Sequence, residues 1–327
     1  KKAYGNHVVF HDVTLTINRG EKVAFVGKNG EGKSTLVKCI MDEIPYEGKL
    51  TIGHNVQIGY FAQNQAQLLD ENLTVFDTID YVAKGDIRLK IRDILGAFMF
   101  GGEASDKKVK VLSGGERSRL AMIKLLLEPV NFLILDEPTN HLDLHATEWL
   151  EAYIQKFRGT VVAISHDRYF LDRSVNRVIE IENGKAEFYS GNYSFYAVEK
   201  ERRYLEKMRQ YEKEQAKIAQ LEKSAEQLRM FAFKGMDKTY RRALSMEKRI
   251  ERMRTTDKPT KERALSAQFK SQEFYGDEVF ALKKLKKSFG DRVLFHDVDL
   301  QVRGGERIAL IGDNGTGKST LIKMLME

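Results

Sequence analysis

Short apolar runs in the first part of the chain each end in small or charged residues. KVAFV at 22–26 leads into a glycine-rich stretch, FLIL at 132–135 into an Asp-Glu pair, and TVVAI at 160–164 into Ser-His-Asp. Apolar runs of this length, bounded by turn-forming or charged residues, predict buried strands. Helical spacing between them predicts an α/β domain with a mainly parallel sheet and a helical subdomain around residues 70 to 125.

The chain becomes charged and helical in character from about Tyr196 to Met253. Leu, Ile, Met and Tyr recur there at three- and four-residue spacing among Lys, Arg, Glu and Gln, with a break near FKGMDKT. This pattern predicts two amphipathic helices that fold back as an antiparallel pair. The following segment, residues 255–276, is predicted to be a tether.

An internal repeat relates the two ends of the chain. The segment that begins at Tyr4 and the segment that begins at Phe289 align without a gap, and Gly27 and Gly312 are likewise 285 positions apart. The match covers FHDV, a Gly-Glu pair and a glycine-rich loop. We therefore expect a second copy of one domain that stops after one strand, one loop and part of a helix.

Composition narrows the class of protein. A single Cys among 327 residues excludes a disulfide framework, and Cys39 lies in an apolar helical pattern as a buried small hydrophobe. No apolar run approaches the roughly 20 residues that span a bilayer, and the N-terminal residues have no signal-peptide core. The net charge of +7 weakly favours a polyanionic partner.

The glycine-rich loop of the first copy has the pattern that holds nucleotide phosphates. Its glycines let the backbone turn N–H groups inward, Lys33 reaches the β- and γ-phosphates, and the hydroxyl of Ser34 ligates Mg²⁺. The sequence therefore predicts an ATP and Mg²⁺ site here. The loop comprises Gly27, Lys28, Asn29, Gly30, Glu31, Gly32, Lys33, Ser34 and Thr35.

Two further strand ends carry candidate catalytic residues. Asp136 can hold Mg²⁺ through water, and Glu137 is placed to orient or deprotonate an attacking water. His166 follows the strand at 160–164. Because the carboxyl ends of parallel strands meet at one sheet edge, we expect all three to lie near the phosphate loop.

A second anion site is predicted at LSGGERSRL. Ser113, Gly114, Gly115 and Glu116 begin a helical run, so N–H groups and a favourable dipole are available there. One nucleotide does not need two such cradles on one domain. We therefore expect a partner domain to present its own nucleotide to this helix.

These motifs together resemble an ATP-binding-cassette domain of the P-loop NTPase class. By that resemblance Tyr4, or Phe289 in the second copy, stacks on adenine, and Gln63 contacts Mg²⁺ and the water. LDEPTNHLD, SHDRYFLD and the charged helical pair resemble the ABC-F family. That family comprises soluble, cytoplasmic twin-cassette ATPases that bind the ribosome, with interdomain helices directed at transfer RNA.

The resemblance implies that the chain has three parts, and the incomplete second copy predicts a slow ATPase. The three parts are a cassette at 1–195, a helical linker at 196–276 and an incomplete cassette at 277–327. The second copy has no Gln, Asp-Glu pair, His or LSGGE of its own, so we expect slow hydrolysis unless a second copy of the chain pairs in trans. Its candidate nucleotide residues are Gly312, Asn314, Gly315, Gly317, Lys318, Ser319 and Thr320, with Ser319 as the metal ligand.

Two halves of the chain resemble different parts of that family. Residues 1 to about 143 look like its second cassette, whereas residues from about 144 onward look like the end of its first cassette and the linker. The junction falls at DEPTNHLD, which both cassettes share. The chain could therefore be a natural sequence or a hybrid of two.

The second half of the linker is basic and aromatic. Either its basic side chains contact RNA phosphates while its aromatics stack on bases, or the aromatics pack the hairpin and the charges only solvate it. The resemblance favours the ribosome and transfer RNA. The residues are Phe231, Phe233, Lys234, Lys238, Tyr240, Arg241, Arg242, Lys248 and Arg249.

Two rival functions share the nucleotide motifs. An ATPase subunit of a membrane transporter would fit the cassette, but a helical linker between fused cassettes suits a ribosome-bound translation or antibiotic-protection factor better. A DNA-associated coiled-coil ATPase should have a coil many times longer than the predicted hairpin of about 60 residues. The histidines other than His166 show no metal-ligand spacing.

Overall fold

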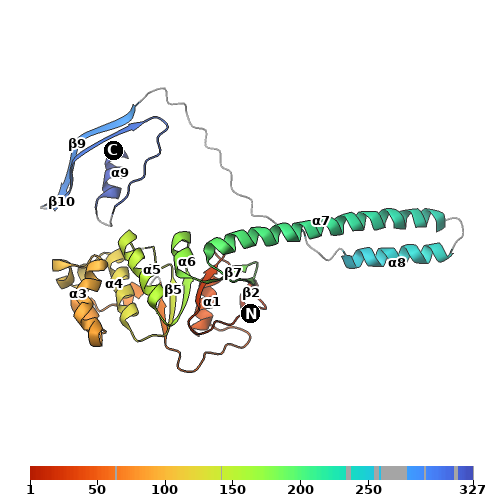
Figure 1. Cartoon of the computed structure of the whole chain (residues 1–327), viewed down its shortest axis with the longest axis horizontal. Coiled ribbons are helices and arrows are strands. Elements are labelled where there is room, and N and C mark those ends of the chain that lie inside the picture. The colour runs from red at the N-terminus through yellow and green to blue at the C-terminus, as the bar shows by residue number, and fades with distance from the viewer. Residues whose placement is uncertain are drawn as a thin grey trace. The chain divides into compact units, whose positions relative to one another are not determined.

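The computed structural model describes residues 1–62, 65–140, 142–232, 237–253, 258, 278–290, 292–312 and 316–326. The chain divides into two compact units. One comprises Lys1–Tyr193 with Phe269–Glu327, and the other comprises Ser194–Gln268. Figure 1 labels the helices and strands along the chain. The predicted tether at 255–276 lies outside the described residues, apart from Lys258.

A six-stranded sheet in the order β4-β5-β6-β3-β7-β8 forms the centre of the first copy. Its first five strands are parallel, and β8 pairs with β7 in the antiparallel sense. The strands predicted at 22–26, 132–135 and 160–164 are confirmed as β3, β5 and β6. The strands are β3 (Lys22–Val26), β4 (Ile58–Phe61), β5 (Phe132–Asp136), β6 (Thr160–Ile164), β7 (Arg177–Glu182) and β8 (Lys185–Tyr189).

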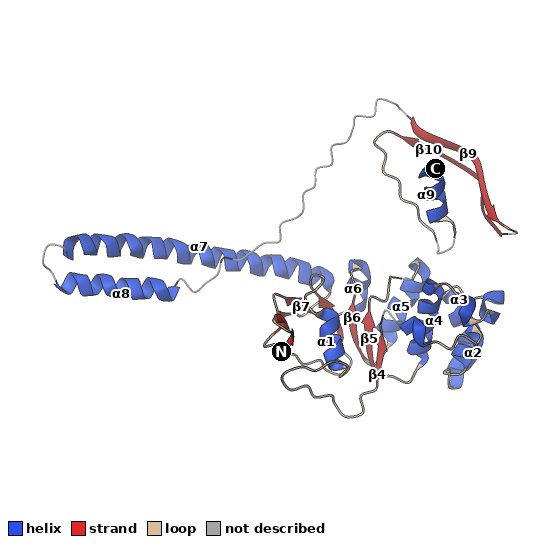
Figure 2. Ribbon diagram, turned by 180° about the vertical axis from the view of Figure 1, so that it is seen from behind, coloured by secondary structure: helices blue, strands red, loops and turns tan. Residues whose placement is uncertain are grey.

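Helices flank this sheet (Figure 2). The apolar core includes Phe25, Ile134 and Val162, each with no exposed surface, together with the buried face of α1. This explains why the central strands are apolar throughout rather than alternating: parallel strands with both faces covered are buried on both sides. The flanking helices are α1 (Lys33–Ile40), α5 (Leu144–Lys156) and α6 (Arg168–Ser174).

The predicted helical subdomain is present. Thr74 caps α2 by accepting a hydrogen bond from the Asp77 N–H at 3.0 Å. Short 3₁₀ turns connect its helices. The helices are α2 (Val75–Asp80), α3 (Ile91–Ala97) and α4 (Gly114–Leu127), and the 3₁₀ turns are η1 (Gln65–Leu68), η2 (Gly85–Lys90), η3 (Gly102–Asp106) and η4 (Val109–Val111).

An aromatic column joins the helical subdomain to α5. The Phe98 ring lies edge-on to Trp149 with centroids 4.8 Å apart, and Trp149 stacks on Tyr153 at 5.4 Å. Tyr153 stacks in turn on Phe157 at 5.8 Å, and its hydroxyl donates to the Leu126 carbonyl at 2.7 Å. The column therefore fixes the end of α3 and the end of α4 against the same helix.

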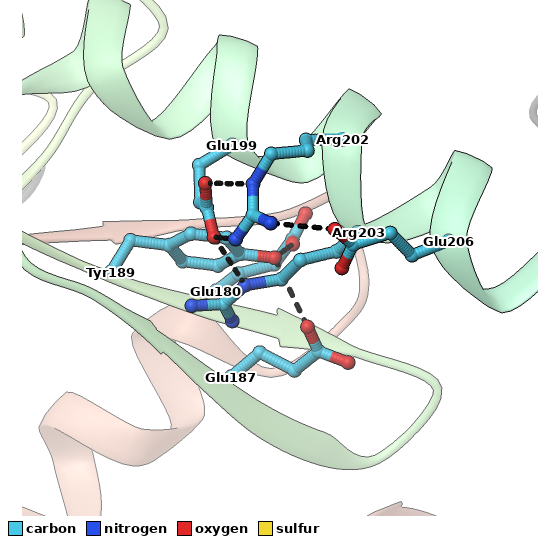
Figure 3. A network of polar contacts seen from close by, with 7 residues as sticks. All are labelled: Glu180, Glu187, Tyr189, Glu199, Arg202, Arg203 and Glu206. Carbon is cyan, nitrogen blue, oxygen red and sulfur yellow. Dashed lines mark hydrogen bonds and ion pairs between the residues drawn. The ribbon is translucent and has the colours of Figure 1, made fainter.

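The second unit consists of the predicted antiparallel helical pair. The helices are α7 (Tyr193–Ala232), which begins in the first unit, and α8 (Asp237–Met253). An ion pair of 3.2 Å between Arg229 and Glu247 joins them, and Ala225 and Ile250 are buried. Along α7, Arg202 pairs with Glu199 and Glu206 at 2.7 and 2.6 Å (Figure 3). No helix among the described residues is long and apolar enough to cross a membrane.

The second copy repeats the opening hairpin of the first. β1 (Lys2–Tyr4) pairs with β2 (His7–Phe10), and β9 (Glu278–Phe289) pairs with β10 (Arg292–Arg303). The pairing of Tyr4 with His7 recurs 285 positions later as Phe289 with Arg292. The helix that follows the second glycine-rich loop is α9 (Lys318–Met326).

The strand expected before the second glycine-rich loop does not form. Residues 307–311 have no strand pairing, and Ile308 and Ile311 are 48% and 86% exposed. The equivalent strand of the first copy, β3, is hydrogen-bonded between β6 and β7. The described part of the second copy has no counterpart of either neighbour, so the apolar pattern there lacks pairing partners.

Replacement of Phe98 by Ala should lower the free energy of unfolding by about 3–5 kcal/mol, because the ring is fully buried and its loss leaves a cavity beside Trp149. Urea unfolding followed by the fluorescence of Trp149, the single tryptophan, measures this. Leu89→Ala, at a side chain 86% exposed, is the control and should cost less than about 0.5 kcal/mol. Equal losses in the two variants would contradict the packing role of the column.

Candidate nucleotide and magnesium site

The phosphate loop connects β3 to α1 and approaches its surroundings too closely for side chains at two positions. A Cβ on Gly27 would lie 2.2 Å from the Ile181 carbonyl oxygen, and one on Gly32 would lie 2.4 Å from Val9 Cγ1. Both glycines also have positive φ, 143° and 96°. The loop can therefore take this course only with glycine at these positions.

Lys33 is the first residue of α1, and its ammonium group lies against the loop backbone. Nζ donates to the carbonyl oxygens of Gly27 and Lys28 at 2.8 and 2.9 Å. The residue is 9% exposed, and burial lowers its pKa against the attraction of Glu137 and Asp136. A cation held here, at the start of a helix, suits a site that receives phosphates.

Asp136 ends β5 beside the first turn of α1. It is 9% exposed, and burial raises its pKa although a hydrogen bond with Ser34 and the charge of Lys33 act in the opposite direction. A hydroxyl and a carboxylate oxygen are ligands that Mg²⁺ prefers, with phosphate oxygens and water completing the shell. Ser34 and Asp136 therefore fit a magnesium ion that is bound together with a nucleotide.

Glu137 and His166 form a pair at the same sheet edge. The ring nitrogen Nε2 of His166 lies 3.4 Å from Glu137 Oε1, and the backbone N–H of His166 donates to Glu137 Oε2 at 3.3 Å. The Glu137 side chain is 12% exposed, and its backbone is left-handed with φ of 51°. Burial raises the pKa of its carboxyl group, which suits a general base. The structure thus brings Lys33, Asp136, Glu137 and His166 together, as the sequence predicts.

Tyr60 on β4 is a neighbour that the sequence analysis missed. Burial, followed by the charge of Asp136, raises its pKa to about 12. Its strand pairs with β5, placing Tyr60 opposite Ile134. Only the position of IGYF before Gln63 could have indicated it.

The predicted second anion site lies at a fully formed helix start. Ser113 caps α4 in a capping box: the Glu116 carboxylate accepts from the Ser113 N–H and hydroxyl, each at 2.7 Å. A Cβ on Gly114 or Gly115 would meet no atom within 4 Å. Arg117 donates to Glu71 at 2.9 Å within the helical subdomain. The start of α4 is therefore open for a ligand from outside.

The predicted adenine-stacking residues are exposed and matched between the copies. Tyr4 is 51% exposed, with Lys2 Nζ 4.6 Å from its ring centroid, and Phe289 is 59% exposed, with Lys287 Nζ at 5.4 Å. In both copies a lysine two residues earlier in the chain therefore lies within cation–π distance of the ring.

The described part of the second glycine-rich loop repeats two contacts of the first. Lys318 Nζ donates to the Gly312 carbonyl oxygen at 2.5 Å, and a Cβ on Gly317 would lie 3.2 Å from the Phe295 ring. Asn314 and Gly315 are outside the described residues, as are Gln63 and the linker residues Phe233 and Lys234. The other basic candidates with described side chains, Arg241, Arg242, Lys248 and Arg249, are exposed on α8.

Comparison with known proteins identifies the family. A model of the ABC transporter family matches residues 10–140 and 295–327, and an associated ABC transporter model matches residues 179–269. A solved ATP-binding subunit of an ABC transporter is similar over 57% of this chain and 85% of its own, with a TM-score of 0.50 and 22% identity. That structural similarity supports the assignment of an ATP-binding-cassette fold to this chain.

Similarity to some curated relatives covers all or nearly all of the chain. Putative ATP-binding protein YdiF of Bacillus subtilis is 33% identical over 100% of this chain and 57% of its own length. Energy-dependent translational throttle protein EttA of Escherichia coli is 31% identical over 97% of this chain and 63% of its own length. ABC transporter F family member 5 of Arabidopsis thaliana is 47% identical over 59% of this chain and 28% of its own length. The chain spans about half the length of the curated relatives that match it throughout.

Asp136→Asn should raise the thermal stability of the nucleotide-free protein at pH 7. Burial raises the folded-state pKa of Asp136 above its ordinary value of 3.8, so ionisation costs stability as the pH rises through this range. The melting temperature should be higher than that of the wild type at pH 7, and the difference should vanish below about pH 3.8, where the carboxyl group is protonated in both the folded and the unfolded state. Scanning calorimetry across pH measures both; a variant less stable at pH 7 would contradict this.

Proposed function

The chain belongs to the ABC-F family of ATP-binding-cassette proteins, and we propose that it binds ATP with Mg²⁺ at the first phosphate loop and hydrolyses it. The observation that carries this proposal is the convergence of Lys33, Asp136, Glu137 and His166 at the carboxyl edge of one parallel sheet. A cation, a metal-binding carboxylate and a base are the parts that phosphoryl transfer to water requires.

Each residue has a distinct task in this mechanism. The Lys33 ammonium exchanges its carbonyl partners for the β- and γ-phosphates, while Ser34 and Asp136 hold Mg²⁺, which neutralises phosphate charge when bound. Glu137 orients a water and takes its proton, for which a raised pKa is suited. His166 fixes the Glu137 carboxylate and can donate to the transferred phosphate.

The helix start at Ser113 to Glu116 completes a nucleotide site that a second cassette presents, either in the same protein or in a second copy of the chain. The capping box uses the N–H groups of Ser113 and Glu116, so Gly114 and Gly115 supply the N–H groups for phosphate oxygens, and the dipole of a 14-residue helix favours such an anion. Closure of two cassettes on ATP would exclude water from the nucleotide, and hydrolysis would release them.

A role on the ribosome rests on the relatives and on the charge of the helical pair. EttA is named a translational throttle protein. The α8 helix presents Arg241, Arg242, Lys248 and Arg249 to solvent, where they can contact RNA phosphates. We therefore propose that the helical pair contacts ribosomal or transfer RNA and that the ATP cycle controls this contact in translation or in ribosome protection from antibiotics.

Lys33→Ala should abolish ATP binding, since the phosphate charge would lose its buried cation. Titration with a fluorescent ATP analogue in Mg²⁺ measures the dissociation constant. Lys49→Ala, at an exposed lysine outside the loop, is the matched control and should bind as the wild type does. Undiminished binding by the Lys33 variant would remove the assignment of the phosphate loop.

Charge reversal at Arg241 and Arg242 should weaken ribosome binding about tenfold or more, and wild-type binding should fall steeply with salt because phosphate contacts release counterions. Co-sedimentation with ribosomes at several salt concentrations measures both effects. Reversal at Lys107 and Lys108, which are exposed in the helical subdomain, changes the net charge equally and serves as the control. If the α8 variant sediments like the wild type, the helices are only a spacer.

A further inference from the structure

The end of β7 and the turn between β7 and β8 contact the phosphate loop at three positions. The residues Ile181, Glu182 and Asn183 follow one another at the end of β7, and each meets a different part of the loop. The Ile181 carbonyl packs on Gly27, Glu182 lies 3.9 Å from the Lys28 ammonium, and the Asn183 N–H donates to Glu31 Oε2 at 2.8 Å.

The geometry of this turn explains why the Asn183 N–H faces the loop. Glu182 and Lys185 form the last pair of the β7–β8 ladder, which leaves Asn183 and Gly184 as a two-residue turn. Both have positive φ, 50° and 74°, as a type I′ turn requires. The ladder does not use the N–H of the first turn residue, so this group is available to an acceptor outside the hairpin.

The same turn also holds the strand that precedes the site. The His11 N–H donates to the Gly184 carbonyl at 2.9 Å, directly after β2. β2 supplies Val9, against which the loop glycine Gly32 packs. The turn therefore supports the loop directly through Glu31 and indirectly through β2.

A carboxylate inside a phosphate-binding loop is electrostatically unfavourable for the nucleotide. Glu31 lies between Gly30 and Gly32, so a freely rotating side chain could approach the phosphates and repel them. The Asn183 N–H instead fixes the carboxylate on the side that faces the hairpin. A hydrogen bond to a charged acceptor is also among the stronger ones, so it can order the loop backbone.

We infer that the hydrogen bond between Glu31 and the Asn183 N–H, here called the loop latch, pre-orders the phosphate loop and thereby sets its affinity for ATP. Glu31 is a positioning residue that acts through the loop's N–H groups, because an ordered loop loses less conformational freedom when the phosphates bind. This inference rests on the proposed function of the loop as an ATP site.

The second copy offers a natural comparison. Thr316 occupies the position equivalent to Glu31, and its hydroxyl lies 3.3 Å from where a Cβ on Gly312 would be. A threonine side chain at this position lies over its own loop and is too short to reach a neighbouring turn as glutamate does. The loop latch is thus a property of the first loop that Glu31→Thr would remove.

The decisive experiment compares Glu31→Gln with Glu31→Ala, two uncharged variants that differ in whether they can accept the hydrogen bond. Glu31→Gln keeps the acceptor and should bind ATP at least as tightly as the wild type, since the repulsive charge is gone. Glu31→Ala and Glu31→Thr should bind about tenfold more weakly than Glu31→Gln. Titration of each with a fluorescent ATP analogue in Mg²⁺ gives these ratios.

Controls separate the loop latch from folding and from the ATP site itself. Asn183→Gly keeps the N–H and tolerates positive φ, so its affinity should equal that of the wild type. Without nucleotide, the melting temperatures of the Ala and Gln variants should differ by at most a few degrees, as expected for one hydrogen bond, so both remain folded. Equal ATP affinity of Glu31→Ala and Glu31→Gln, in a protein whose wild type binds ATP, would overturn the loop latch alone. A wild type that binds no ATP would overturn the proposed function and the loop latch with it.

Discussion

The burial of one ammonium group among oxygen atoms is the interaction on which the site depends. Lys33 is only 9% exposed, so its ammonium group requires the two loop carbonyls that accept its hydrogen bonds, and Glu137 and Asp136 add opposite charge nearby. That requirement fixes where β3 and β5 must end relative to each other. The sheet order places β6 between them, which brings His166 to the same edge. The parallel sheet thus positions one buried cation beside two carboxylates and a histidine.

This arrangement of charges leaves the site poised for an anion. Burial raises the pKa values of Asp136 and Glu137 and lowers that of Lys33, so each group is held in a less favourable environment than water. A polyanion with a divalent cation supplies the charges that would relieve this strain. The buried charges therefore lower the stability of the nucleotide-free protein, and nucleotide binding would restore it, as is common at functional sites.

Much of this could be predicted from the sequence, because the information is local. The apolar runs predict β3, β5 and β6, and Ser113 followed by Glu116 at the start of α4 matches a capping box. Contacts between distant segments could not be predicted: Glu31 and Asn183 are 152 residues apart, and nothing local to either indicates the partner. The prediction of a strand before the second glycine-rich loop was wrong for a related reason, since a strand needs neighbours that its own pattern does not specify.

Hydrogen exchange of the backbone amides, with and without Mg²⁺-ATP, tests the central claim most directly, because it locates the nucleotide without altering any side chain. The account predicts that ATP slows exchange across residues 28–35, where the loop N–H groups face the phosphates, and at the ends of β5 and β6, where Glu137 and His166 lie. Unchanged exchange at residues 28–35 under saturating ATP, with protection elsewhere in the chain, would contradict it.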